Sequence, residues 1–160
     1  MAFPISGLAG AKIDEATTDK KFAVGTVADL SDGGAAIYVS ATSTISQFNA
    51  VVIDAANGAV PVTTTNAATT KRLAFAQTSI ASGYFGWVNL SGTVKVTLAA
   101  NCDDNVPLYT TATGGVLDDA IVTDALCLGV TSTVTISNAT AVTCIAARGA
   151  MIGSGSMEGE

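Results

Sequence analysis

The longest regular pattern in this sequence is ASGYFGWVNLSGTVKVTL, residues 81–98. From position 88 onward the even-numbered residues are Val, Leu, Gly, Val, Val and Leu, and the odd-numbered residues are Asn, Ser, Thr, Lys and Thr. A period of two places these two sets on opposite faces of a β-strand. The stretch therefore predicts a long strand with one face in the core.

Two features interrupt this pattern. Gly92 lies in the core-facing row, and a glycine inside a strand typically marks a bulge, a bend or the close approach of another backbone. We therefore expect the strand to be bent. Phe85 and Trp87 lie on the opposite face, so another element must cover two large rings. Either a second protein chain or a second sheet of the same chain could do so.

Composition favours one folded all-β domain. A chain of 160 residues can remove about 70% of its unfolded surface from water. Apolar residues make up 49% of the sequence and charged residues only 12%, whereas disordered chains are rich in charge. Thr and Val fit pleated sheets better than helices. We expect a small antiparallel β-barrel or sandwich with an extended N-terminal arm.

The predicted organisation is an N-terminal arm at residues 1–21, a β domain at 22–150 and a flexible C-terminal tail at 151–160. Asn57 and Gly58 predict a tight hairpin between 51–53 and 59–62, and Pro61 suggests that the second arm lies at a sheet edge. Residues 118–125 are either a loop or one helical turn. The other expected strands are 22–27, 35–40, 48–53, 72–77, 106–110, 116–117, 126–130, 134–136 and 141–146.

Charge and hydropathy exclude several classes of partner. The formal net charge is −6, which disfavours contacts with nucleic-acid phosphates. No run approaches the 18 or more apolar residues typical of a membrane helix, and no secretion signal is expected. Cys102, Cys127 and Cys144 lie in or near apolar stretches, so we expect free buried thiols in a protein made in a reducing cytosol.

The sequence does not predict an enzyme. It has no histidine, which removes Ser-His, Cys-His and His-metal chemistry. The acidic pairs at 103–104 and 118–119, with Asp124, are expected to be solvated turn carboxylates rather than general acids or calcium ligands. Cys102 lacks a positive neighbour that would activate a thiolate. We expect no catalytic residue, no metal and no cofactor.

The order of several short motifs resembles the capsid decoration (cement) proteins of tailed bacteriophages, specifically their small all-β family. The similarity covers residues 73–147, while residues 1–21 and Cys102 have no counterpart. The motifs are LAFAQ at 73–77, IASG at 80–83, WVNLSGTVKV at 87–96, VPLYTT at 106–111, the glycines at 114–115, LGV at 128–130 and VTCIAA at 142–147.

This resemblance implies a structural protein made in the host cytoplasm and bound to the capsid surface of the virion. It implies binding to the major capsid protein, self-association as a homotrimer, and stabilisation of the shell against internal DNA pressure. No nucleic acid or membrane is implied as a partner. The residues expected at a subunit or capsid interface are Phe85, Trp87, Lys71, Arg72, Phe3 and Ile5.

Two other functions stay open. A carbohydrate-binding or adhesive β module, such as a head fibre or a lectin-like domain, would use Trp87 with Tyr84 or Phe85 as stacking platforms for sugars. A hydrolase on a small β scaffold is the third possibility. Retention on a glycan column that depends on Trp87 would distinguish the carbohydrate-binding module.

Overall fold

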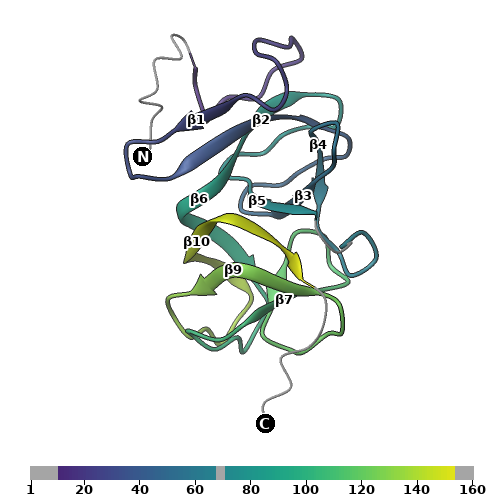
Figure 1. Ribbon diagram of the computed structural model, residues 1–160. Helices are drawn as coiled ribbons and strands as arrows, with labels where there is room; N and C mark the ends of the chain where they lie inside the picture. Colours follow the sequence, from purple (N-terminus) through teal and green to yellow (C-terminus); the bar gives the residue numbers. More distant parts are fainter. Residues whose placement is uncertain (1–10, 68–70, 154–160) are drawn as a thin grey trace.

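The computed structural model describes residues 11–67 and 71–153 and confirms an all-β fold (Figure 1). These residues contain no helix, and hence none that could span a membrane. The strands are β1 (Val27–Asp29), β2 (Ala35–Ala41), β3 (Ala50–Ile53), β4 (Gly58–Pro61), β5 (Arg72–Phe75), β6 (Phe85–Leu98), β7 (Leu108–Thr110), β8 (Leu117–Asp118), β9 (Leu126–Ser132) and β10 (Thr140–Gly153).

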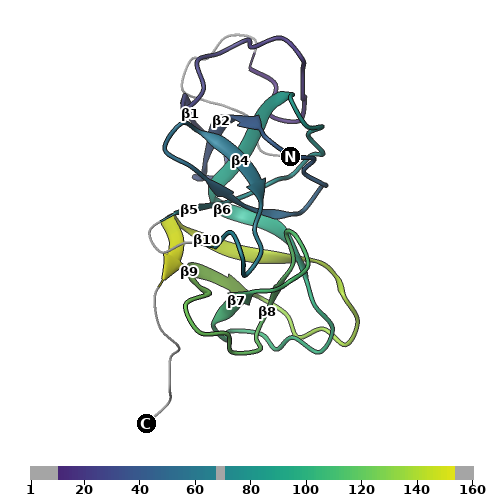
Figure 2. The ribbon, with the colours of Figure 1, turned by 90° about the vertical axis from the view of Figure 1, so that its right-hand side faces the viewer.

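The ten strands form one sheet that curls into two circuits sharing β6. The first circuit runs β2, β4, β3, β5, β6 and back to β2, and the second runs β6, β8, β7, β9, β10 and back to β6. Figure 2 shows the two circuits above and below one another. The β5–β6 and β6–β8 pairings each join a single residue pair, so neither circuit is a regular barrel. Two pairings, β2–β4 and β6–β8, are parallel.

The predicted bend in the long strand is confirmed at Gly92. Residues before it pair with β2, and residues from Gly92 onward pair with β10. Gly92 has φ of 101°, a conformation that side chains disfavour, and a Cβ atom there would lie 3.0 Å from the Cα of Gly34. The bend therefore needs glycine both for its backbone angle and for the close approach of the chain that leads into β2.

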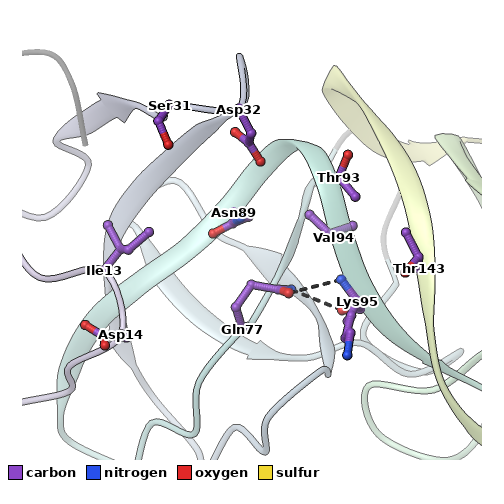
Figure 3. Close-up of a pocket in the computed structure, with 10 residues that line it drawn as sticks. All are labelled: Ile13, Asp14, Ser31, Asp32, Gln77, Asn89, Thr93, Val94, Lys95 and Thr143. Atoms are coloured by element: carbon purple, nitrogen blue, oxygen red, sulfur yellow. Dashed lines mark hydrogen bonds between the residues drawn. The ribbon is translucent and has the colours of Figure 1, made fainter. Parts of the chain in front are cut away.

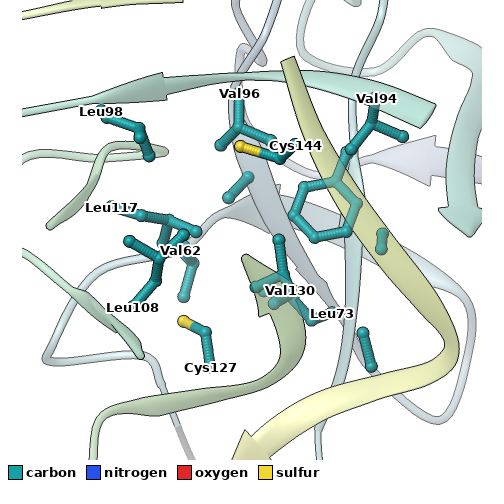
Figure 4. Packing of buried hydrophobic residues seen from close by; sticks show 14 of the residues in the cluster. Val62, Leu73, Val94, Val96, Leu98, Leu108, Leu117, Cys127, Val130 and Cys144 are labelled. Atoms are coloured by element: carbon teal, nitrogen blue, oxygen red, sulfur yellow. The ribbon is translucent and has the colours of Figure 1, made fainter. Parts of the chain in front are cut away.

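Each circuit encloses a separate core. Val88 of β6 packs in the first core with residues of β2, β3 and β5, whereas Val94 and Val96 pack in the second core with residues of β7 to β10 (Figure 4). Strands β3 and β5 lie between the two cores. Val51 points into the first core and Val52 into the second, which explains why β3 is apolar at every position.

A third apolar cluster lies outside the first circuit and contains Trp87. Tyr38 and Trp87 pack there with ring centroids 5.2 Å apart, and Phe22 packs at 5.5 Å from Trp87. The cover comes from residues 11–24, which we call the strap. Thr17 of the strap exchanges two backbone hydrogen bonds with Phe85, of 2.8 and 2.9 Å. The rings are thus covered by their own chain, but by a segment that adds no further sheet.

Several local predictions are confirmed or corrected by the register. The hairpin is confirmed, with Val52 opposite Val60 and Asn57 at φ of 62°. The prediction that Pro61 lies at a sheet edge is wrong, because β4 lies between β3 and β2. Proline is tolerated there because the residues of β4 that pair with β2 are Gly58 and Ala59. Residues 118–125 contain no helical turn.

Other differences concern element ends. The strand predicted at 22–27 begins only at Val27, because Gly25 at φ of 89° turns the chain and frees the preceding apolar side chains to cover Trp87. Residues 134–136 are not a strand. Residues 151–153, predicted as tail, belong to β10, and Met151 pairs with Leu128 of β9. The rest of the predicted tail lies outside the described residues.

We expect Gly92→Ala to lower the free energy of unfolding by about 2 to 4 kcal/mol, because backbone strain adds to the contact with Gly34. Gly33→Ala is the matched control, since Gly33 has φ of 82° but open space around a Cβ. It should lose only about 1 kcal/mol. Urea unfolding of both variants measures the difference. If both variants lost the same free energy of unfolding, the close approach of Gly34 to Gly92 would contribute nothing to the cost of the substitution.

Candidate functional site

The structure places Trp87 inside the protomer rather than on its surface. Its exposed fraction is 2%, and Tyr38 and the strap surround it. This corrects the expectation that its ring is available to a subunit, a capsid or a sugar, because almost none of the ring reaches solvent. Phe85 is half-buried and stacks on Tyr38 with a centroid distance of 6.3 Å. Its interface role stays a prediction, and Phe3 and Ile5 lie outside the described residues.

The basic pair predicted at an interface bonds to the chain's own loops. Lys71 donates from Nζ to the carbonyl oxygen of Asn66 at 3.1 Å, and Arg72 donates from Nη2 to Oδ1 of Asn57 at 2.8 Å. These bonds link the start of β5 to the loop after β4 and to the β3–β4 hairpin. Whether the two cations also meet a partner stays a prediction.

An exposed apolar surface on the second circuit was missed in the sequence. Leu128, Ile145 and Met151 are 43%, 49% and 39% exposed, and we call them the β9–β10 apolar surface. Leu128 and Met151 are directly paired, while Ile145 lies farther along β10. The signal was present in the alternation at 144–146, where Cys144 and Ala146 face inward and Ile145 must face outward. Exposed apolar side chains mark a contact with a partner when they form part of one larger patch.

A cysteine and two aspartates meet at the end of the second circuit. Sγ of Cys102 and carboxylate oxygens of Asp118 and Asp119 lie within 4.8 Å of one another. Asp119 accepts a hydrogen bond from the backbone N–H of Asp103 at 2.9 Å, so it also holds the turn. Burial and the adjacent carboxylates raise the pKa of Cys102 to about 11, and burial raises the pKa of Asp118. At neutral pH the thiol is protonated, so it is a poor nucleophile.

A groove lies at the bend of β6, where the two circuits meet (Figure 3). It encloses about 480 Å³. The strap, the turn between β1 and β2, the segment after β5, β6 itself and β10 all contribute to its walls. The lining residues are Ile13, Asp14, Ser31, Asp32, Gln77, Asn89, Thr93, Val94, Lys95 and Thr143.

Two amides in this groove are placed differently. Gln77 accepts a hydrogen bond from the backbone N–H of Lys95 and donates one to its carbonyl oxygen, both of 3.0 Å, so its side chain replaces a neighbouring strand. Asn89 is only 6% exposed, yet its side-chain amide makes no hydrogen bond with any residue the structure describes. Nothing in the sequence distinguishes Asn89 from the other residues in the polar row of this strand.

Because Trp87 is in a core, Trp87→Ala should lower the free energy of unfolding by about 3 to 5 kcal/mol. Tyr84→Ala is the control, since Tyr84 lies close by in the sequence and is 37% exposed; it should change stability by less than about 0.5 kcal/mol. Chemical denaturation measures both. A fully stable Trp87→Ala protein would show that the strap does not enclose the ring in solution.

The three thiols should react slowly in the folded protein. Burial raises the pKa of Cys127 and Cys144 to about 12 each, and Cys102 titrates at about 11. Relative to the ordinary value of 9.0, Cys102 then has about a hundredfold less thiolate at pH 8. Iodoacetamide labelling followed by mass spectrometry should find no modified cysteine until denaturant is added. Rapid labelling of the native protein at pH 8 would contradict this.

No protein family and no curated protein matches this sequence. Among solved structures, the chain is similar to the head fiber gp8.5 N base in bacteriophage phi29, with a TM-score of 0.50 and 14% sequence identity. The similarity covers 72% of this chain and 96% of that chain. At this level of identity the likeness concerns the fold alone. The chain therefore has a fold similar to that of a bacteriophage head-fibre base.

Proposed function

We propose that this protein is a structural protein of a bacteriophage virion and that it binds the outside of the head. The observation that carries the proposal is the fold similarity to a head-fibre base of bacteriophage phi29, which spans nearly all of that chain. The order of motifs along residues 73–147, which resembles the capsid decoration proteins, supports the same role. Both lines of support lead to a protein that functions through its surfaces.

In its specific form, the proposal is a capsid decoration protein that binds the major capsid protein, assembles as a homotrimer and stabilises the shell. The β9–β10 apolar surface supports a protein partner, because Leu128, Ile145 and Met151 are exposed side chains on neighbouring strands. A stable interface buries about 1,200 to 2,000 Å² in total. The three side chains would therefore form the apolar centre of a larger contact with a polar rim.

A head-fibre base is the second candidate, and the fold similarity favours it directly. Both candidates attach to a head, but they differ in what attachment does to the shell. A decoration protein adds contacts between capsomers and therefore raises the temperature at which heads release DNA. A fibre base needs only to be anchored, so it can bind heads without changing that temperature.

We also propose that the protein has no enzymatic role. The full sequence contains no histidine, and the raised pKa of Cys102 keeps its thiol protonated near neutral pH. The nearby carboxylate of Asp119 accepts a backbone hydrogen bond within its own turn. These features support a role in binding rather than catalysis.

We expect Ile145→Asp to weaken binding to heads by about tenfold or more, because a buried interface would then contain an unpaired charge. Val27→Asp is the matched control: Val27 is 42% exposed, but it lies on β1, which pairs with β2 outside the second circuit. Cosedimentation with heads that lack this protein measures binding, and native mass spectrometry measures the oligomer.

The same experiment distinguishes the candidates. Binding with a higher temperature of DNA release supports decoration, and binding without that change supports a fibre base. Failure of the unmodified protein to bind heads would contradict both. Equal losses for Ile145→Asp and Val27→Asp would show that the β9–β10 apolar surface is not the contact.

A further inference from the structure

We propose that the groove at the bend of β6 binds a neutral saccharide, using the side chains of Asn89, Thr93 and Asp32. The inference depends on the groove alone and does not require the head-binding role. It also differs from the sugar platform expected in the sequence, because Trp87 is enclosed beneath the strap.

The strongest observation is the amide of Asn89, which faces the groove and has no hydrogen-bond partner among the described residues. Its residue is 6% exposed and lines the groove, where Figure 3 shows it between Asp32 and Gln77. No described residue forms a hydrogen bond with its side chain. The amide is open to the groove rather than sealed from solvent, since Oγ1 of Thr110 is the one fully buried side-chain atom without a partner among the described residues. A ligand that fills the groove and offers both a donor and an acceptor would satisfy this amide.

Other free polar groups surround the same space. The carboxylate of Asp14 and the hydroxyls of Thr93 and Thr143 form no hydrogen bond with the residues that the structure describes. Asp32 uses Oδ1 to accept the backbone N–H of Gly34 at 2.9 Å, while Oδ2 makes no such bond. Sugar hydroxyls both donate and accept, so they can donate to carboxylates and accept from an amide. These groups are therefore suited to a ligand with several hydroxyls.

The groove also offers an apolar contact to a ligand. Ile13 of the strap is half-buried at one wall, while Val94 lies behind the groove with its side chain in the second core. A sugar ring has C–H groups on its faces as well as hydroxyls around its rim, so it can contact both kinds of wall. The space of about 480 Å³ falls within the range of about 300 to 1,000 Å³ found for small-molecule pockets. It is large enough for one or two sugar rings.

The charges of the groove disfavour simple ions. Asp14 and Asp32 would repel an anion, and the ammonium of Lys95 lines the same space and would repel a divalent cation. Lys95 already lies 5.7 Å from the ring centroid of Phe48, so it is held near the groove by a cation–π contact. A neutral ligand meets neither form of repulsion.

Strand addition by a peptide is also disfavoured. Asn89 pairs with Ala36 of β2 on one side and with Phe75 of β5 on the other. On the far side of the bend, Lys95 pairs with Thr143 of β10, and the amide of Gln77 occupies its other edge. The backbone at the groove therefore offers no free edge to an added strand, and recognition must use side chains.

The test is a ¹⁵N–¹H NMR titration of the full chain with maltose, cellobiose and N,N′-diacetylchitobiose at millimolar concentrations. We expect at least one disaccharide to shift the Asn89 and Thr93 resonances. Asn89→Leu should weaken that binding at least tenfold, because leucine offers the ligand neither a donor nor an acceptor. Thr93→Val should weaken binding several-fold.

Thr97→Val is the matched control, because Thr97 lies on the same strand outside the groove and should leave binding unchanged. If Asn89→Leu does not fold, saccharide binding by Thr93→Val and Asp32→Asn is compared with that of Thr97→Val instead. The proposal is overturned if none of the disaccharides shifts the groove resonances, or if all variants bind as the unmodified protein does. Shifts produced by calcium chloride or by an unstructured peptide in the absence of any saccharide response would also overturn it.

Discussion

The backbone conformation of Gly92 is the constraint on which the rest of the structure depends. At φ of 101° it redirects β6, so that one strand pairs with β2 before the bend and with β10 after it. Val88 and Val94 therefore enter different cores, although they belong to one alternating row. The close passage of Gly34 fixes where the redirection occurs. One residue thus couples two circuits that would otherwise need separate strands.

The bend also creates the surfaces available for binding. A strand that changes direction separates its flanking elements, and the groove lined by Asn89 opens between the two circuits at that point. Gln77 fills the missing strand position beside Lys95, which satisfies the backbone without closing the groove. The β9–β10 apolar surface lies on the second circuit, away from the strap. The groove and this apolar surface are formed by different residues, but they adjoin, because Ile145 pairs directly with Thr93.

The interior has little reactive chemistry. Burial raises the pKa of all three thiols, and the sequence has no histidine. The chain shares its fold with a phage head-fibre base, and the structural role that we propose would be carried out by its surfaces. The strap has a separate effect: by enclosing Trp87 it removes the most conspicuous aromatic residue from the surface. The exposed apolar residues that remain include Tyr84 and Ile145.

By itself, the sequence determined the features that depend on neighbours in the chain: the all-β class, the alternation and bend of residues 85–98, and the hairpin at Asn57. Steric limits on φ and a side-chain period of two operate locally, so they can be read without tertiary contacts. Only the tertiary structure decided which segment covers Trp87, that β4 is not an edge, and that Asn89 lacks a partner. Those outcomes depend on which distant segments meet, and a row of polar residues looks the same whether it faces water or a groove.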